Sequence, residues 1–244
     1  MGCDTLPGMK TQPFEVIPVL DIRHGQAVRA VAGDRANYQP LITPLASTAE
    51  PLAVALGYRR LFPFQTLYLA DLDGIEGRGL NSKVAAAISA HWSDLDIWTD
   101  NGSFDEQGVG LLLERDNATA VVGSESGVGT SDLQRLIERF GESIVLSLDF
   151  AGDDFTGANK LLADASRWPR RIIVMTLGRV GTNRGPDLER LEEIARRAGP
   201  SRLVYAAGGV RDRDDLLAVR AAGASGALVA SALHSGQIKT GGLL

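Results

Sequence analysis

Two aspartates follow short apolar segments at matching places in the two halves of the chain. Asp21 directly follows Val16–Leu20, and Asp149 directly follows Ile144–Leu148. In an α/β barrel, a carboxylate at the carboxyl end of a buried strand faces the place where active sites lie. Two opposed carboxylates can serve as general base and general acid when their surroundings separate their pKa values. The pair therefore predicts proton-transfer chemistry, and capping of the following turn is the structural alternative for either residue.

Small residues occupy the turns after four other apolar segments. They are Gly102, Gly123, Ser124, Gly208, Gly209 and Ser231. Backbone N–H groups that no side chain covers can approach an anion closely, and the loops after strands seven and eight of a barrel are a frequent phosphate site. Two such sites would suit a substrate with a phosphate at each end, whereas tight turns are the structural alternative. Asp100 weakens the earlier site, because a carboxylate repels phosphate.

Further candidates lie in two loops. Thr176 ends the sixth apolar segment, and Arg179 and Arg184 follow it in a glycine-rich loop. Either arginine could clamp a phosphate or simply be solvated. Arg29 lies in the long connection 23–47, which could close over a ligand.

Metal and organic cofactors are not expected. His24, His91 and His234 are scattered without the spacing of metal ligands. The region around Gly208 and Gly209 lacks a complete dinucleotide-binding motif, and no Walker motif occurs.

Short apolar runs alternate with helical patterns along the chain, which predicts a (β/α)8 TIM barrel; a doubly wound open sheet is the alternative. The predicted strands are Val16–Leu20, Thr66–Ala70, Leu95–Thr99, Thr119–Val122, Ile144–Leu148, Arg171–Met175, Leu203–Ala206 and Gly226–Val229. The predicted helices are Ala46–Leu56, Ser82–Ala90, Asp105–Arg115, Thr130–Phe140, Gly157–Arg167, Asp187–Ala198 and Arg213–Ala222.

A faint internal repeat relates the two halves. A shift of 107 residues, as from Gly102 to Gly209, also superposes Asp105 on Asp212 and Ser124 on Ser231. Shared periodicity of strands and helices could produce the same matches, so the repeat indicates two related half-barrels without proving them.

Composition narrows the function classes. The net charge is −5, with 30 acidic and 25 basic residues, which argues against a nucleic-acid partner. Cys3 is the only cysteine, so no intramolecular disulfide can form. No apolar run is long enough for a membrane span, and residues 1–13 lack the apolar core of a signal peptide. We expect an N-terminal tail at 1–13, a single barrel at 14–244, a cytoplasmic location, and a monomer or small homo-oligomer.

Longer motifs resemble the histidine-biosynthesis barrel family, which contains the HisA isomerase and the HisF cyclase. They are VIPVLDIRHGQAVRAVAGDR at 16–35, YLADLDGIEGRGLN at 68–81, and the segments VVGSES, LSLDF, YAAGGVRDRDDLLAV and GALVASALHSGQI. The resemblance covers nearly the whole chain after residue 13. It implies a barrel of two fused half-barrels, and Arg29 within VRAVAGDR is more similar to the isomerase.

The resemblance to the isomerase implies an Amadori rearrangement of a phosphorylated aminoaldose without a cofactor. Asp21 would remove the C2 proton, Asp149 would protonate the ring oxygen, and Thr176 would orient the substrate. The residues implied in substrate and phosphate binding are Arg29, Gly102, Gly123, Ser124, Gly208, Gly209 and Ser231. The expected partner is a small phosphorylated metabolite.

Four loops depart from the family pattern. Asp100-Asn101-Gly102-Ser103-Phe104 stands where Gly-Gly-Gly-Ile-Arg is usual, Val180 replaces an aspartate, Ala230 replaces a glycine, and the loop after Asp149 lacks its usual basic character. Such changes favour a different, singly phosphorylated substrate. A related branch of unsettled activity, with a link to methanopterin-type one-carbon metabolism, resembles the chain too. A divergent enzyme of this kind and a non-catalytic barrel that binds a phosphorylated ligand are therefore the alternatives.

Overall fold

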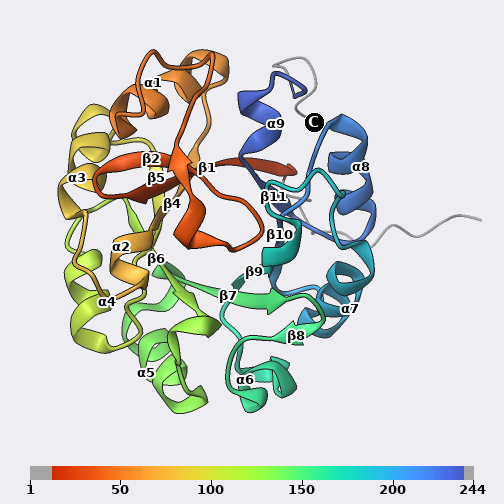
Figure 1. Ribbon diagram of the computed structural model, residues 1–244. Coiled ribbons are helices and arrows are strands. Elements are labelled where there is room, and N and C mark those ends of the chain that lie inside the picture. The colour runs from red at the N-terminus through yellow and green to blue at the C-terminus, as the bar shows by residue number, and fades with distance from the viewer. Residues whose placement is uncertain (1–12, 239–244) are drawn as a thin grey trace, which may run out of the picture.

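Eight parallel strands close into a barrel in the computed structural model, which describes residues 13–238 (Figure 1). The barrel strands are β1 (Glu15–Arg23), β4 (Thr66–Asp71), β5 (Asp96–Asp100), β6 (Ala118–Gly123), β7 (Ile144–Ala151), β9 (Arg171–Thr176), β10 (Leu203–Ala207) and β11 (Gly226–Val229). Pairing of β11 with β1, which places Glu15 opposite Gly226, completes the ring. The TIM-barrel prediction is confirmed, and each predicted strand coincides with one of these.

Helices form a ring around the strands (Figure 1). They are α1 (Pro51–Leu61), α2 (Leu72–Ile75), α3 (Ser82–His91), α4 (Glu106–Leu112), α5 (Thr130–Phe140), α6 (Asn159–Ala163), α7 (Leu188–Ala198), α8 (Arg213–Ala221) and α9 (Ser231–His234). Short 3-10 turns are η1 (Arg35–Asn37), η2 (Ser124–Ser126), η3 (Gly141–Ser143), η4 (Ala165–Arg167) and η5 (Leu177–Arg179). Within the described residues, no helix is long and apolar enough to cross a membrane.

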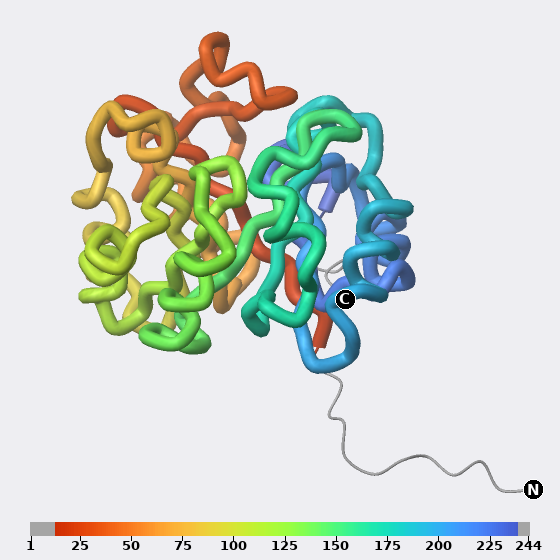
Figure 2. The backbone as a smooth tube through the Cα atoms, turned by 90° about the horizontal axis from the view of Figure 1, so that it is seen from below, coloured from red at the N-terminus to blue at the C-terminus, as the bar shows by residue number. Residues whose placement is uncertain are grey.

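The long connection after the first strand is structured. β1 turns back into β2 (Gln26–Arg29), and β2 pairs in turn with β3 (Gln39–Pro40). A second small hairpin joins β7 to β8 (Asp154–Phe155). Figure 2 shows the orange segment between β2 and α1 projecting from one end of the barrel, the end at which the β7–β8 hairpin also lies. These additions therefore surround the carboxyl ends of the parallel strands.

Side-chain alternation divides each strand between two apolar layers. The barrel interior holds one residue from every parallel strand, namely Ile17, Tyr68, Trp98, Val121, Val145, Ile173, Tyr205 and Leu228. The Tyr205 ring packs edge-on against Trp98 at 4.9 Å, and the Arg171 guanidinium lies 5.2 Å from the Trp98 ring. This packing fills the barrel below the carboxyl ends of the strands, so that a ligand can enter only above it.

The half-barrel repeat has structural counterparts. Asp105 accepts a hydrogen bond from Gly108 N at 2.8 Å and begins α4, and Asp212 accepts from Asp215 N at 3.0 Å and begins α8. Such N-terminal caps typically stabilise a helix by about 1 kcal/mol. Residues 107 positions apart therefore start equivalent helices after the third and the seventh barrel strands.

Three predicted helices were wrong in their bounds, and one of them, Asp105–Arg115, is observed as α4 and ends earlier, at Leu112. Helix Ala46–Leu56 is observed as α1, which begins at Pro51 because the Glu50 side chain caps Leu52 N and Ala53 N. Proline favours the first helical position, since its missing N–H has no partner there. The helix predicted at 157–167 is split into α6 and η4, because Asp164 caps the second segment through Ser166 N. The predicted tail at 1–13 and Cys3 lie outside the described residues, apart from residue 13.

Candidate active site

A cavity of about 910 Å³ opens at the carboxyl end of the barrel, and four aspartates line it. One of them, Asp212, caps α8 through Asp215 N, and the other three project from barrel strands. Asp21, Asp100 and Asp149 stand at inward positions of β1, β5 and β7, because each lies an even number of residues after an interior residue such as Trp98 or Val145. The alternation that fills the barrel with apolar side chains thus turns these three carboxylates towards the ligand. The structure brings together the two predicted catalytic aspartates, and it adds a third.

Asp21 is the least constrained of the three. Its carboxylate accepts no hydrogen bond from any side chain or backbone group in the described part of the chain. Burial raises the pKa of Asp21 to about 7, and the positive charge of Arg35 opposes this rise. A carboxyl group with a pKa near neutrality can take up or release a proton at physiological pH. Asp21 is therefore free to exchange a proton with a ligand.

Asp149 is held firmly. It accepts hydrogen bonds from Ser147 Oγ at 2.6 Å, Ser124 Oγ at 3.0 Å and the backbone N–H of Glu125 at 3.2 Å. Burial raises the pKa of Asp149 to about 6, and these three donors limit the rise because they stabilise the ionised form. The carboxylate is thus both fixed in direction and titratable near neutral pH.

Asp100 is the site residue whose catalytic potential sequence reasoning missed. It accepts a hydrogen bond from Gly102 N at 3.1 Å and lies 3.4 Å from the Tyr68 hydroxyl. Burial and the neighbouring Asp149 carboxylate raise the pKa of Asp100 to about 7. A Cβ atom on Gly123 would lie 3.3 Å from Asp149 Oδ2 and 3.5 Å from Asp100 Oδ2, so the two carboxylates converge on one point. The sequence could have indicated this role, because Asp100 lies at the end of an apolar segment, as Asp21 and Asp149 do.

Arg35 brings a positive charge to the carboxylates. Its guanidinium forms an ion pair with Glu125, which also lines the cavity. Its positive charge opposes the rise in the pKa of both Asp21 and Asp100. Arg35 comes from η1, so the connection between β1 and α1 completes the site from above.

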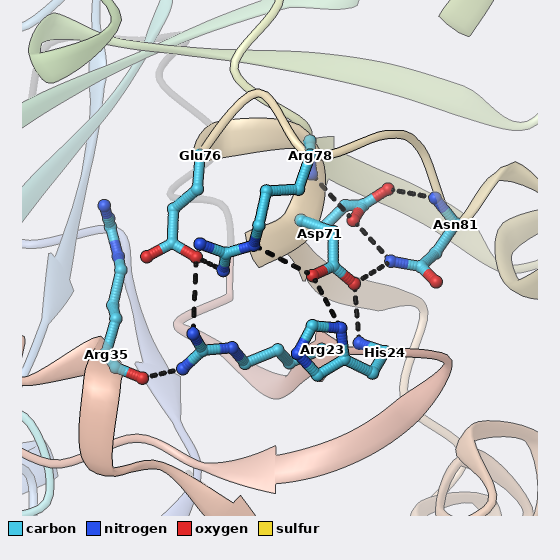
Figure 3. Close-up of polar contacts among 9 residues, drawn as sticks. Arg23, His24, Arg35, Asp71, Glu76, Arg78 and Asn81 are labelled. Carbon is cyan, nitrogen blue, oxygen red and sulfur yellow. Dashed lines mark hydrogen bonds and ion pairs between the residues drawn. The ribbon is translucent and has the colours of Figure 1, made fainter.

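A polar network anchors this connection (Figure 3). Arg23 donates to the carbonyl oxygen of Arg35, and its guanidinium lies 3.9 Å from Glu76. The neighbouring His24 donates its backbone N–H to Asp73 Oδ2 at 2.5 Å, and its ring lies 3.3 Å from the same carboxylate. The β1–β2 turn is therefore tied to the segment after β4, which fixes the backbone from which Arg35 reaches the cavity.

The loops after β10 and β11, residues 208–212 and 230–231, are called here the second-half loops. Gly208, Gly209 and Ser231 line the cavity, and their backbone N–H groups have no hydrogen-bond partner among the described residues. A Cβ on Gly208 would lie 2.6 Å from Thr176 O, and one on Gly209 would lie 2.2 Å from Gly185 O, so only glycine fits this turn. Exposed amides in a glycine turn can bind an anion.

The loops after β5 and β6, residues 100–103 and 123–127, are called the first-half loops and differ in this respect. Gly123 and Ser124 are buried, and neither they nor Gly102 line the cavity. The Ser124 hydroxyl contacts Asp149 through two hydrogen bonds, at 3.0 Å to Oδ2 and 2.9 Å from the backbone N–H. Ser124 therefore holds the Asp149 carboxylate in place, and its predicted role in phosphate binding stays a prediction.

The remaining predicted residues are partly in place. Arg29 lines the cavity, as does Met175, but Thr176 is buried and does not line it. Arg179 donates to the carbonyl of Arg184 at 3.1 Å, and Arg184 donates back to the same loop at 3.1 Å, so both stabilise their own turn. No group of histidine, cysteine, aspartate or glutamate in residues 13–238 has the geometry of a metal site.

A histidine that the sequence left unassigned joins distant elements beside the second-half loops. The Tyr58 hydroxyl donates to Val19 O at 2.7 Å and lies 2.8 Å from His234 Nε2, while Thr43 Oγ1 lies 3.0 Å from His234 Nδ1. Because Tyr58 donates its single proton to Val19, Nε2 must carry the imidazole proton and Nδ1 must accept from Thr43. Burial lowers the pKa of His234 to about 4, which keeps the ring neutral.

Comparison with known proteins identifies the family. The family model described as "Histidine biosynthesis protein" matches residues 15–239. The chain belongs to this family. The match extends over the whole barrel, and the expectation drawn from the sequence motifs is confirmed.

Similar proteins include two named isomerases and one uncharacterised protein. A 1-(5-phosphoribosyl)-5-((5-phosphoribosylamino)methylideneamino) imidazole-4-carboxamide isomerase of Chloroflexus aurantiacus is 30% identical, with 93% of this chain and 95% of the relative covered. Phosphoribosyl isomerase A of Streptomyces coelicolor is 29% identical, with coverage of 91% and 93%. An uncharacterised protein of Methanocaldococcus jannaschii is 28% identical, with coverage of 91% and 94%. All three align along nearly their full lengths.

Proposed function

We propose that this protein is a HisA-like isomerase that converts a phosphorylated ribosyl-aminoaldose into the corresponding aminoketose. The observation that carries this proposal is the convergence of Asp21 and Asp149 on one cavity, each with a pKa raised towards neutrality. The isomerase names of full-length relatives support the same reaction. The reaction is an Amadori rearrangement, which needs proton transfers and no redox step.

The chemistry can be assigned to the two aspartates. Asp149 protonates the ring oxygen, the bond from that oxygen to C1 breaks, and an iminium forms between C1 and nitrogen. Asp21 then takes the C2 proton, which leaves an enaminol. Protonation at C1 and loss of the proton from the C2 hydroxyl give the ketose, so no atom is gained or lost. Asp21 suits the base role because no donor in the described chain occupies its carboxylate.

Asp100 supports the acid role of Asp149. Two carboxylates that converge on one point do not readily ionise together, so the pair retains a proton to a higher pH than an isolated aspartate. That shared proton is available for the ring oxygen. Thr176 lies at the end of β9 and does not line the cavity, so its role in orienting the substrate stays a prediction.

The second-half loops hold phosphate in this proposal, through the backbone N–H groups of Gly208, Gly209 and Ser231. Arg29 contributes positive charge from β2 on the same side, near enough to His234 to lower that residue's pKa. The partner is a small phosphorylated metabolite. A cytoplasmic location and a monomeric or small homo-oligomeric state complete the proposal.

A turnover assay tests the function. The protein is incubated with the bis-phosphoribosyl imidazole carboxamide for which the relatives are named, and with each compound that lacks one of its two phosphates. Formation of the ketose is followed by coupling to the next enzyme or by mass-resolved chromatography. We expect turnover of at least one compound, and a loss of about 100- to 10,000-fold in Asp21→Asn, since general base catalysis contributes that much. Folded wild-type protein that isomerises none of the three would refute the proposal.

A further inference from the structure

We infer that the substrate carries one phosphate, bound by the second-half loops, and that Asp100 and Glu125 exclude a second phosphate from the opposite side of the cavity. The group at that opposite side is neutral or positively charged and donates hydrogen bonds, as sugar hydroxyls or an amine do. This inference rests on the proposed function, since it names the class of substrate that the same site accepts.

Hydrogen-bond donors are already occupied at the first-half loops. Gly102 N–H donates to Asp100, Ser103 N–H donates to Asn101 Oδ1 at 3.1 Å, and Glu125 N–H donates to Asp149. A phosphate needs several donors, because its oxygens are acceptors only. These loops therefore offer it few, whereas the amides of the second-half loops remain without partners in the described chain.

Negative charge prevails on the same side. Asp100, Asp149 and Glu125 all line the cavity there, and the positive charge beside them comes from Arg35. Arg35 is already paired with Glu125 and lies near Asp100. Its charge is thus offset before any ligand enters, and a phosphate dianion would meet uncompensated carboxylates at short range.

Carboxylate oxygens with spare acceptor capacity indicate what this side binds instead. Asp100 Oδ2 accepts only a long hydrogen bond from the Tyr68 hydroxyl, at 3.4 Å, among the described residues, and it converges with Asp149 Oδ2 on one point. Asp21 accepts no hydrogen bond from the described residues. A ligand group placed among these oxygens must supply protons for hydrogen bonds, because buried acceptors without donors are costly.

The internal repeat provides the comparison within one molecule. A shift of 107 residues places Asp100 on Ala207 and Glu125 on Ala232, and both alanines line the cavity. Asp100 and Ala207 are each the last residue of their strands. The two halves thus share their backbone plan, and the half without the two carboxylates is the one whose amides are free.

Phosphate binding tests the inference independently of turnover. Inorganic phosphate is titrated at pH 8 into wild-type protein, into Asp100→Gly with Glu125→Ala, and into a control with Asp116→Gly and Glu138→Ala, which removes two equal charges from exposed positions. Crystals of each protein are soaked in phosphate to locate it. We expect one phosphate in wild type and control, at Gly208 and Ser231, and two in the double variant. Asp100→Asn with Glu125→Gln serves where the first double variant does not fold.

A phosphate at Gly102 and Ser124 of the wild-type protein, or none at Gly208 and Ser231, would overturn the inference. Steady-state kinetics with the two compounds that lack one phosphate provide a second test. Removing the phosphate that faces the first-half loops should leave kcat/KM unchanged or higher, and removing the other should lower it about 100-fold. Comparable losses for both phosphates would overturn the inference while the isomerase function stood. If none of the compounds were isomerised, the function would fall, and the phosphate count would still decide the inference.

Discussion

The Asp100→Asn substitution should stabilise the protein in a manner that depends on pH. Asp100 is only 6% exposed, and its pKa rises from 3.8 to about 7 on folding. The folded state therefore holds this proton more tightly than the unfolded state. The contribution of this proton to the free energy of unfolding is fully present below pH 3.8 and is lost as the pH rises through about 7. Asparagine removes the charge and can still accept from Gly102 N through its carbonyl oxygen.

The magnitude follows from the shift. One pKa unit corresponds to about 1.4 kcal/mol, so the carboxylate costs up to about 4 kcal/mol once it is ionised in the folded state. At pH 5 only about a third of this cost applies, because folded Asp100 is still protonated. The advantage of Asp100→Asn over wild type should therefore grow by about 2–3 kcal/mol between pH 5 and pH 8.

Urea denaturation of both proteins at several pH values measures this difference, with far-UV circular dichroism as the signal. Asp116→Asn, at an exposed position, is the matched control and should show no such growth. An advantage that stays constant with pH would mean that side-chain packing causes it. No advantage at pH 8 would refute the argument that burial and the Asp149 charge raise the pKa of Asp100.

Three further substitutions probe the elements around the site. Ser124→Ala removes a donor from Asp149 at 3.0 Å and should raise the pKa of this general acid, so the basic limb of the kcat/KM profile should move to higher pH; an unchanged profile would contradict the positioning role. Wild-type protein should lose up to about 3 kcal/mol of unfolding free energy between pH 6.5 and about 4, because the folded state disfavours the protonated His234 ring. His234→Gln should lack this loss, and paired urea titrations at these two pH values would show the difference. Gly209→Ala places a Cβ 2.2 Å from Gly185 O at a positive φ of 89°, and should lower the unfolding free energy by about 2–4 kcal/mol and abolish phosphate binding; wild-type stability and affinity would refute the close approach.

The barrel could be predicted from sequence because its signals are local. Apolar runs and the glycine and proline stops mark each strand, and the same alternation points Asp21 and Asp149 inwards. Asp100 obeys the same rule, so its inward position was equally predictable from the alternation along its strand. The start of α1 was also readable, since Pro51 follows a side chain that can cap the helix.

Other parts of the site depend on contacts between distant residues. Ser124 reaches Asp149 because β6 and β7 pair with Gly123 opposite Ser147, and no local pattern determines that register. Arg35 lies in a connection without periodicity, and its position depends on how Arg23 meets Glu76. These interactions join residues that are far apart in sequence, so no local sequence pattern predicts them.

Ala207→Asp tests whether one carboxylate is sufficient to convert a phosphate-binding half into a phosphate-excluding one. Ala207 ends β10 as Asp100 ends β5, faces the cavity, and precedes Gly209 by the same two residues that separate Asp100 from Gly102. The introduced carboxylate should accept from Gly209 N–H and lower phosphate affinity at least about 100-fold. Ala207→Asn is the control, because its amide oxygen can accept from the same N–H without adding charge. A loss confined to the aspartate variant would show that charge excludes phosphate, and equal losses would show that occupation of the amide does. Unaltered phosphate affinity in both variants would refute the equivalence of the two halves on which the single-phosphate inference depends.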